Sequence, residues 1–367
     1  MTVNATTVSA GEALRVLQAG WAAQEAGGLT ASWMLHGRPG VGKTEIVQTL
    51  ARRIGADLFD LRLTTIEPQD LRGLPFFDHD RARTVWYRPE DLPDGDGPAI
   101  LFLDELTAAA PTLQPTVYGL LQERRVGRHR LPDRVMVIAA GNRVEDGAIA
   151  YDMGSALSDR LIHMVVQASA EDWLTGYAAG AGIHPAVAAF IRTRPDLLET
   201  TEDSLRRGRL IACTPRSWTR VSHIMHSVPD RALRQVMIAG TIGDAAAADF
   251  ALIADDIAAT VGIAAMLAAD RADRAALYPR TLHGLTALVF GLTGLVTRDT
   301  LPAAIDILAD LRGLDTRTHG GLPLTELAGF GFELLIGHAL ERGWQEVFAT
   351  SASYADYAAA RQAAGLP

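Results

Sequence analysis

The sequence predicts an α/β fold in which a doubly wound, parallel β-sheet is followed by all-helical regions. Short continuous apolar runs at residues 31–35, 99–103 and 135–140 are typical of strands buried on both faces of a parallel sheet. Residues 58–63 and 161–166 are two further candidate strands, and helical patterns such as residues 112–123 separate the runs. After residue 167 the strand signals end and only helical patterns remain.

This alternation divides the chain into four predicted regions. They are an N-terminal helical segment (1–30), an α/β core (31–167), a small helical domain (168–254) and a C-terminal helical region (255–367). Helices are expected at 11–26 and 45–54, and then at 172–181, 185–192, 214–228 and 230–242. Residues 72–98 are rich in proline and glycine, which predicts a loop-rich insertion in the core.

Composition limits the classes of partner and compartment. A net charge of −9 over 367 residues disfavours nucleic acid, although arginines cluster at 124, 125, 128, 130 and 134. The single cysteine, Cys213, excludes an intramolecular disulfide and a four-cysteine zinc site. No signal-peptide pattern opens the chain, and the long uncharged stretch at 281–297 fits a buried helix better than a membrane span. We therefore expect a cytoplasmic protein without a membrane partner.

The only lysine of the chain lies in a glycine-rich segment between a predicted strand and a predicted helix. The segment runs through Gly37, Arg38, Pro39, Gly40, Val41, Gly42, Lys43, Thr44 and Glu45. It matches the phosphate-binding loop pattern, in which backbone N–H groups surround the β-phosphate at a helix N-terminus. Lys43 would neutralise phosphate oxygens and the Thr44 hydroxyl would ligate Mg²⁺. The alternative is a glycine turn that happens to precede a helix.

An acidic pair follows the apolar strand at residues 99–103. Asp104 would hold the water shell of Mg²⁺, and Glu105 would orient and polarise the attacking water, because ligands bind at the carboxyl ends of parallel strands. The alternative is that the two acids cap a helix. Asn142 follows the strand at 135–140, where its amide would contact the γ-phosphate or the attacking water, or would only form a turn.

Two arginines are candidates for contacts with phosphate. Arg160 precedes the last predicted strand and would reach the γ-phosphate of a neighbouring subunit, unless it only forms a surface ion pair with Asp159. Arg216 follows Thr214 and Pro215, which are suited to the N-cap and first position of a helix. A cation in the first turn opposes the helix dipole, which indicates an anionic partner or a solvated arginine.

The order of these motifs resembles the AAA+ ATPases, and among them the MoxR family. Residues 103–106, 110–114 and 120–126 are similar to the MoxR stretch around and after the acidic pair, and residues 138–142 to its sensor 1 strand. Residues 153–160 resemble its arginine-finger helix, so the resemblance covers about residues 31–221. The chain departs from the family pattern at Thr107 and Ala108, where relatives usually carry Asn-Arg.

The resemblance implies an AAA+ core followed by an all-helical lid, and a homo-hexameric ring with ATP between subunits. It further implies sensor 2 at Arg216, a helix-2 insert at 67–93 and a pre-sensor hairpin at 125–131. A protein partner is implied, most simply one with a von Willebrand factor A domain. The expected activity is hydrolysis of MgATP coupled to remodelling of that partner. Two alternatives stay open, which are an ATP-gated binding module with negligible turnover and a DNA-stimulated motor.

Overall fold

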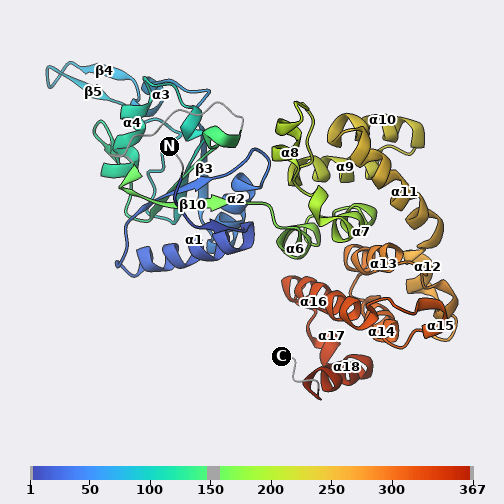
Figure 1. Cartoon of the computed structure of the whole chain (residues 1–367). Helices are drawn as coiled ribbons and strands as arrows, with labels where there is room; N and C mark the ends of the chain where they lie inside the picture. Colours follow the sequence, from blue (N-terminus) through green and yellow to red (C-terminus); the bar gives the residue numbers. More distant parts are fainter. Residues whose placement is uncertain (1–2, 147–157, 364–367) are drawn as a thin grey trace. The chain divides into compact units, whose positions relative to one another are not determined.

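The computed structural model describes residues 3–146 and 158–363 of the chain. It divides into two compact units (Figure 1). The first consists of Met1–Ser169 with Thr201–Gly208, and the second of Ala170–Thr200 with Arg209–Pro367. The predicted division of the helical part at residue 255 stays a prediction, since the whole helical part forms one unit by this criterion.

The first unit is built on a parallel sheet with the strand order β1-β10-β2-β9-β6-β3. Its strands are β1 (Thr7–Val8), β2 (Ser32–His36), β3 (Asp57–Arg62), β6 (Ala99–Asp104), β9 (Val135–Gly141) and β10 (Leu161–Val166). Its helices are α1 (Ala10–Glu25), α2 (Lys43–Ile54), α3 (Pro68–Arg72), α4 (Gln114–Tyr118) and α8 (Thr201–Arg206). The parallel α/β fold is therefore confirmed, with strands at all five predicted positions and the two-residue strand β1 in addition.

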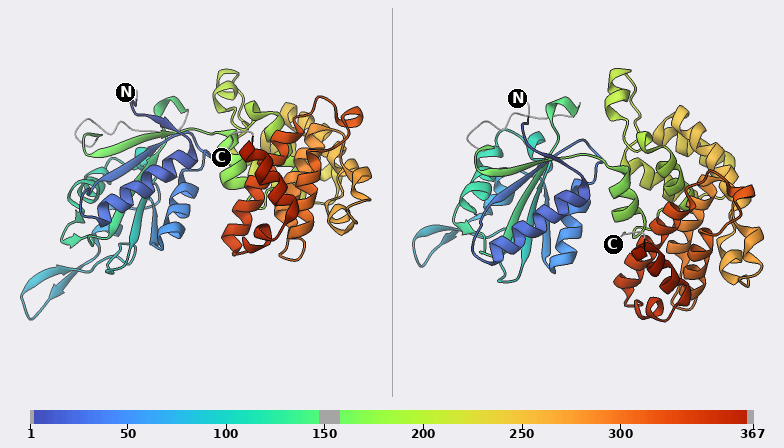
Figure 2. Two further views of the ribbon diagram at one scale, coloured as in Figure 1. Left: turned by 90° about the horizontal axis from the view of Figure 1, so that it is seen from below. Right: turned by 60° about the horizontal axis from the view of Figure 1, so that its bottom comes forward.

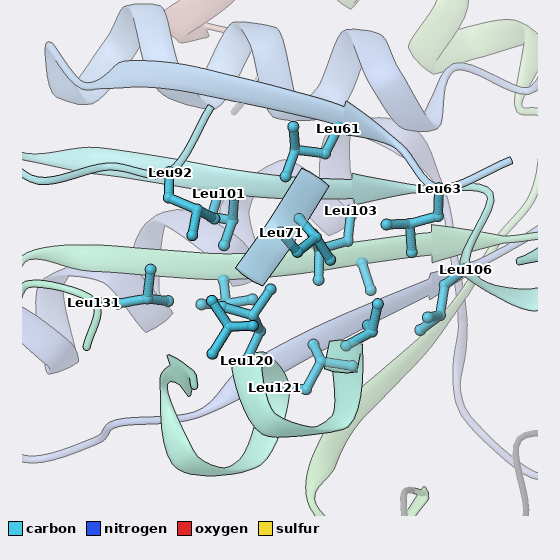
Figure 3. Packing of buried hydrophobic residues seen from close by; sticks show 14 of the residues in the cluster. Leu61, Leu63, Leu71, Leu92, Leu101, Leu103, Leu106, Leu120, Leu121 and Leu131 are labelled. Carbon is cyan, nitrogen blue, oxygen red and sulfur yellow. The ribbon is translucent and has the colours of Figure 1, made fainter. Parts of the chain in front are cut away.

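Both faces of the sheet are covered, which explains why its central strands are continuous apolar runs. On β6, Ile100 and Phe102 pack with residues of α1 and α2, whereas Leu101 and Leu103 pack on the opposite face. The second face carries a cluster of leucines contributed by the strands, α3 and the segments around α4 (Figure 3). Successive side chains of a strand point to opposite faces, so each buried strand contributes to two cores.

Two hairpins interrupt the α/β pattern. The strands β4 (Pro75–Asp78) and β5 (Arg83–Trp86) form an antiparallel hairpin that projects from the first unit (Figures 1 and 2). It lies within the predicted insertion, and its Phe76 and Phe77 are about half exposed. The strands β7 (Arg125–Val126) and β8 (His129–Arg130) form the short hairpin expected at 125–131.

The second unit is all-helical in the residues that the structure describes. Its helices are α6 (Ala170–Asp172), α7 (Pro185–Thr193), α9 (Pro215–Ser227), α10 (Arg231–Ile242), α11 (Asp244–Thr260), α12 (Ile263–Ala268), α13 (Leu282–Leu295), α14 (Leu301–Leu311), α15 (Thr316–His319), α16 (Leu324–Arg342), α17 (Glu346–Ala349) and α18 (Ala352–Ala363). Phe190, Trp218 and Phe250 join α7, α9 and α11 through ring contacts of 5.1–5.8 Å. The uncharged stretch at 281–297 forms the buried helix α13, as predicted.

One helical stretch, Asp244–Ala268, is long and apolar enough by length and composition to cross a membrane. It divides into α11 and α12 in the second unit. Asp255 pairs with Arg231 at 2.5 Å, and Oδ2 of Asp256 accepts a hydrogen bond from Nε2 of His283 at 2.7 Å. These contacts tie the polar side of α11 to neighbouring helices of its own unit.

Candidate nucleotide site

The predicted phosphate loop connects the end of β2 to the start of α2. Gly42 is the N-cap of α2 with φ 107°, and Gly40 has φ 82°, so both occupy conformations that favour glycine. A Cβ atom on Gly37 would lie 2.5 Å from the carbonyl oxygen of Val166, on the neighbouring strand β10. The glycines are thus required by the backbone path, and they leave the N–H groups of the loop at the N-terminus of a twelve-residue helix.

The structure brings Lys43 and Asn142 together from α2 and the end of β9. The Lys43 ammonium donates to the carbonyl oxygens of Gly37 at 2.6 Å and Arg38 at 3.1 Å, and to Oδ1 of Asn142 at 3.1 Å. Lys43 is only 9% exposed, so its charge is presented from a fixed and largely dry position. Glu45, in the first turn of α2, accepts hydrogen bonds from Thr49 and Arg52 along the helix.

The acidic pair lies at the carboxyl end of β6, as predicted. Asp104 is buried, and its Oδ1 accepts the backbone N–H of Glu105 at 2.9 Å. Glu105 has φ 60°, which is uncommon for a residue other than glycine and turns the chain sharply out of the strand. Backbone strain of this kind concentrates at functional sites, where surrounding structure maintains it.

Two residues at the end of the neighbouring strand β3 contact this pair, and the sequence reasoning missed both. The hydroxyl of Thr64 donates a hydrogen bond to the Glu105 carboxylate. Arg62 places its Nε 3.9 Å from Glu105 Oε1 and its Nη2 4.0 Å from Asp104 Oδ2. The position of Glu105 is therefore set by β3 as well as by its own strand.

Thr107 anchors the backbone of the predicted sensor residue. Its hydroxyl donates to the carbonyl oxygen of Asn142 at 2.9 Å. A Cβ atom on Gly141 would lie 2.5 Å from that hydroxyl oxygen, so β9 and the turn after β6 are in close contact here. The departure from the family pattern at residue 107 thus provides a hydrogen bond between the two elements that carry Glu105 and Asn142.

A buried carboxylate joins the loop after Asn142 to the phosphate loop. The side chain of Asp146 is fully buried and accepts hydrogen bonds from Arg143, with Nη2 at 2.8 Å and Nε at 3.2 Å. The Nε of Arg38 lies 3.6 Å from the same carboxylate. These two cations keep a buried negative charge compensated and fix the loop beside the phosphate-binding residues.

A histidine pair lies directly below the phosphate loop. His36 is buried at the end of β2, and its Nε2 is 2.9 Å from Nδ1 of His163 on β10. Burial lowers the pKa of His36 to about 4, and the charges of His163, Arg143 and Lys43 add to this effect. His36 is therefore neutral at physiological pH and adds no further positive charge to the site.

The residues present fit a magnesium ion bound together with a nucleotide. Thr44 and Asp104 offer a hydroxyl and a carboxylate oxygen, which are the hard donors that Mg²⁺ prefers. In the part of the chain that the structure describes, no group of three or more His, Cys, Asp or Glu residues could hold a metal alone. Two protein oxygens are the expected number for a Mg²⁺ that is otherwise held by phosphates and water.

Arg160 lies at the opposite edge of the sheet from Lys43. It immediately precedes β10, whose first residue Leu161 pairs with Ser32 at the start of β2, whereas the phosphate loop follows the end of β2. A strand of five residues separates the two edges by roughly 16 Å at ~3.3 Å per residue. Residues 153–157 of the predicted arginine-bearing helix lie outside the described residues.

Arg216 belongs to the helical unit. Thr214 caps α9 through a capping box and Pro215 takes the first helical position, as predicted. Arg216 is exposed in the first turn. Its role toward a nucleotide stays a prediction.

Comparison with known proteins identifies the class of this site. Residues 32–161 match the family model described as AAA domain (dynein-related subfamily). The chain is 35% identical over 104 residues to mouse ATPase family gene 2 protein homolog B, which covers 28% of this chain and 12% of that protein. It is 31% identical over 137 residues to uncharacterized protein YeaC of Bacillus subtilis, covering 35% and 40% of the two chains.

A named chaperone is also similar. Chaperone MoxR1 of Mycobacterium tuberculosis is 29% identical over 140 residues, covering 36% of this chain and 35% of that one. Among solved structures, a ruvB mutant of Thermotoga maritima has a TM-score of 0.40 at 15% identity, covering 88% and 89% of the chains. A putative ATPase of Cytophaga hutchinsonii has a TM-score of 0.33 at 14% identity, covering 89% and 90%.

The α/β unit is an AAA+ domain, with its phosphate loop, acidic pair and Asn142 at one edge of a parallel sheet. Within that class the domain is similar to those of chaperone MoxR1 and of YeaC. The chain spans between 12% and 40% of the length of the curated relatives named above, so activity and partners of the whole protein belong to the proposals below.

Proposed function

We propose that the chain binds and hydrolyses MgATP at the interfaces of a ring of identical copies, and that turnover remodels or activates a protein partner. The observation that carries this proposal is the convergence of Lys43, Asp104, Glu105 and Asn142 at one edge of the sheet. Lys43 would bind phosphate oxygens, the Thr44 hydroxyl would ligate Mg²⁺, and Asp104 would hold the water shell of the ion. Glu105 activates the attacking water and Asn142 positions it.

Assembly of several copies is supported by the position of Arg160. It lies a strand's length away from Lys43 of the same chain, so contact with a γ-phosphate requires a neighbouring copy. A head-to-tail contact between identical chains closes into a ring when its rotation permits. Six copies, and a partner with a von Willebrand factor A domain, are the assembly and partner that the MoxR resemblance supports.

Steady-state ATP turnover tests the catalytic part of the proposal. Glu105→Gln keeps the shape of the side chain but removes the base, so turnover is expected to fall by about 10²–10⁴-fold. Nucleotide binding, measured by titration with a fluorescent ATP analogue, is expected to persist because Lys43 and the loop are unchanged. Equal turnover of wild type and variant, or none in either, would contradict the assignment.

A mixing experiment tests the role of Arg160 in a neighbouring site. Arg160→Ala and Glu105→Gln subunits are each expected to be inactive alone, and mixed assemblies are expected to recover turnover. In a mixed pair, the intact Glu105 of one copy meets the intact Arg160 of the next. Absence of recovery at every mixing ratio, in assemblies shown by native mass measurement to contain both chains, would refute this role.

One observation favours a second candidate, an ATP-gated binding module with negligible turnover. The Thr64 hydroxyl donates a hydrogen bond to one oxygen of the Glu105 carboxylate, where it competes with a water molecule for that oxygen. Phosphate release separates the candidates. Tight ATP binding without phosphate release, with and without a partner, would favour the binding module.

A further inference from the structure

A second positively charged site lies at the amino-terminal edge of the sheet. A cavity of about 320 Å³ opens beside the first residue of β2, and its wall includes Thr30, Ser32, Gln122, Arg124 and Arg160. Among the lining residues that the structure describes there is no carboxylate. Two guanidinium groups facing one cavity without an acidic group in its wall favour an oxyanion as the occupant.

Arg124 is held in place but is not fully satisfied. Its Nη2 donates to the carbonyl oxygens of Pro132 at 3.0 Å and Val135 at 2.6 Å. Its Nη1 is buried and has no hydrogen-bond partner among the residues that the structure describes. Because Nη1 is sealed from solvent and Nη2 is bonded to two carbonyl groups, the guanidinium is fixed in the wall of the cavity.

The backbone at Arg124 is also in an unusual conformation. Arg124 has φ 52°, and among the described residues it shares a positive φ outside glycine only with Ala82 and Glu105. Burial lowers the pKa of its guanidinium, and the exposed Asp133 opposes this effect. An arginine remains charged in a protein, so the side chain presents a fixed cation with little rotamer freedom left to lose.

Arg160 completes the cavity. In the amide orientation that satisfies both groups, the Gln122 side-chain oxygen accepts from Nε and Nη2 of Arg160 at 3.3 Å. Gln122 thereby orients one guanidinium toward the cavity that the other lines. The phosphate loop of the same chain follows the far end of β2, so it cannot deliver its nucleotide to this edge.

We propose that Arg124 acts together with Arg160 on the terminal phosphate of ATP bound to the phosphate loop of a neighbouring copy. This rests on the proposed function and adds a second arginine to it. Both guanidinium charges line one cavity without a carboxylate among its described lining residues, and together they would attract a phosphate group.

The test is subunit mixing with Arg124→Gln, which removes the charge but keeps donors for the carbonyls of Pro132 and Val135. Alone, this variant is expected to turn over ATP at least tenfold more slowly while binding a fluorescent ATP analogue with wild-type affinity. Mixed with Glu105→Gln subunits, it is expected to recover turnover, as the Arg160→Ala mixture does. Arg15→Gln, an equivalent change on the exposed face of α1, is the matched control and is expected to behave as wild type.

The outcomes separate this inference from the proposed function. Suppose that the Arg160→Ala mixture recovers turnover and the Arg124→Gln mixture does not. This result would overturn the role of Arg124 and leave the role of Arg160 intact, because a defect within the Arg124→Gln subunit's own site cannot be complemented by a Glu105→Gln subunit. Failure of both mixtures would remove the proposed function. If Arg124→Gln does not fold, Arg124→Lys provides the same test. It keeps the charge, so partial turnover is expected.

A free anion is the other source of the same chemistry, and it requires its own measurement. The measurement uses Lys43→Ala protein, which lacks the phosphate-loop cation. Any rise in its melting temperature on addition of inorganic phosphate is expected to be the same with Arg124 present and with Arg124→Gln. Stabilisation by phosphate that Arg124→Gln abolishes, together with no recovery in the mixtures, would assign the cavity to a free anion instead.

Discussion

Replacing Thr107 by valine should weaken both the fold of the AAA+ domain and its turnover. Valine has the shape of threonine but lacks the hydroxyl that donates to the carbonyl oxygen of Asn142 at 2.9 Å. The carbonyl is left without this partner in a partly buried position, which costs about 1–2 kcal/mol. For a unit of this size that loss corresponds to a melting temperature lower by roughly 2–8 °C.

The same change loosens a residue of the site. Asn142 would lose one of the contacts that fix its backbone while its side chain contacts Lys43, and small displacements of such groups cost up to about 10²-fold in rate. Thermal unfolding and steady-state ATP turnover measure the two effects. Thr107→Ser, which keeps the hydroxyl, should recover most of the turnover. The reasoning would be refuted by a valine variant that turns over ATP normally and melts within 1 °C of wild type. A difference of 1 °C corresponds to about 0.3 kcal/mol for a unit of this size.

Two further predictions concern the same edge of the sheet. Lys43→Arg should weaken ATP binding at least tenfold, because a planar fork cannot take the place of an ammonium held by three oxygens within 3.1 Å; unchanged affinity in a fluorescent-nucleotide titration would contradict this. Burial depresses the pKa of His36 to about 4, so the unfolded chain binds the proton more tightly than the folded protein. Above pH 6.5 His36 is neutral in both states, and stability falls as pH drops from 6.5 toward 4. Urea unfolding should show about 2 kcal/mol of this loss between pH 7.5 and 5 in wild type but not in His36→Gln, and an equal pH dependence of the two proteins would exclude it.

The sheet and the main site residues could be predicted because both depend on local signals. A strand buried on two faces must be apolar throughout, and a phosphate loop requires glycine where φ is positive, as at Gly40 and Gly42. The edge rule for parallel strands then places Asp104 and Asn142 beside Lys43 without knowledge of the packing. The same rule applied to residues 58–63 would have suggested Thr64, which directly follows that strand and contacts Glu105.

Other features depend on contacts between distant residues and could not be predicted. Arg124 was one of five clustered arginines, and only the tertiary structure distinguishes it by its buried Nη1 and its positive φ. Asp146 lies in a loop without a motif, and its importance comes from two arginines that reach it from different segments. In both cases burial of a charge decides the role, and burial is a property of the assembled fold.

The register of the sheet gives assembly a geometric reason. Leu161 pairs with Ser32, so Arg160 is fixed at the edge where β2 begins, while Lys43 is fixed beyond the edge where it ends. Rotation of an arginine side chain cannot cover the length of a five-residue strand, and the strand cannot shorten without breaking its ladder. If Arg160 and Arg124 act on a phosphate at all, they act on the nucleotide of another copy, and a single chain therefore contains two halves of different sites. Dilution should then reduce turnover per chain more steeply than it reduces nucleotide binding, since only turnover needs both halves.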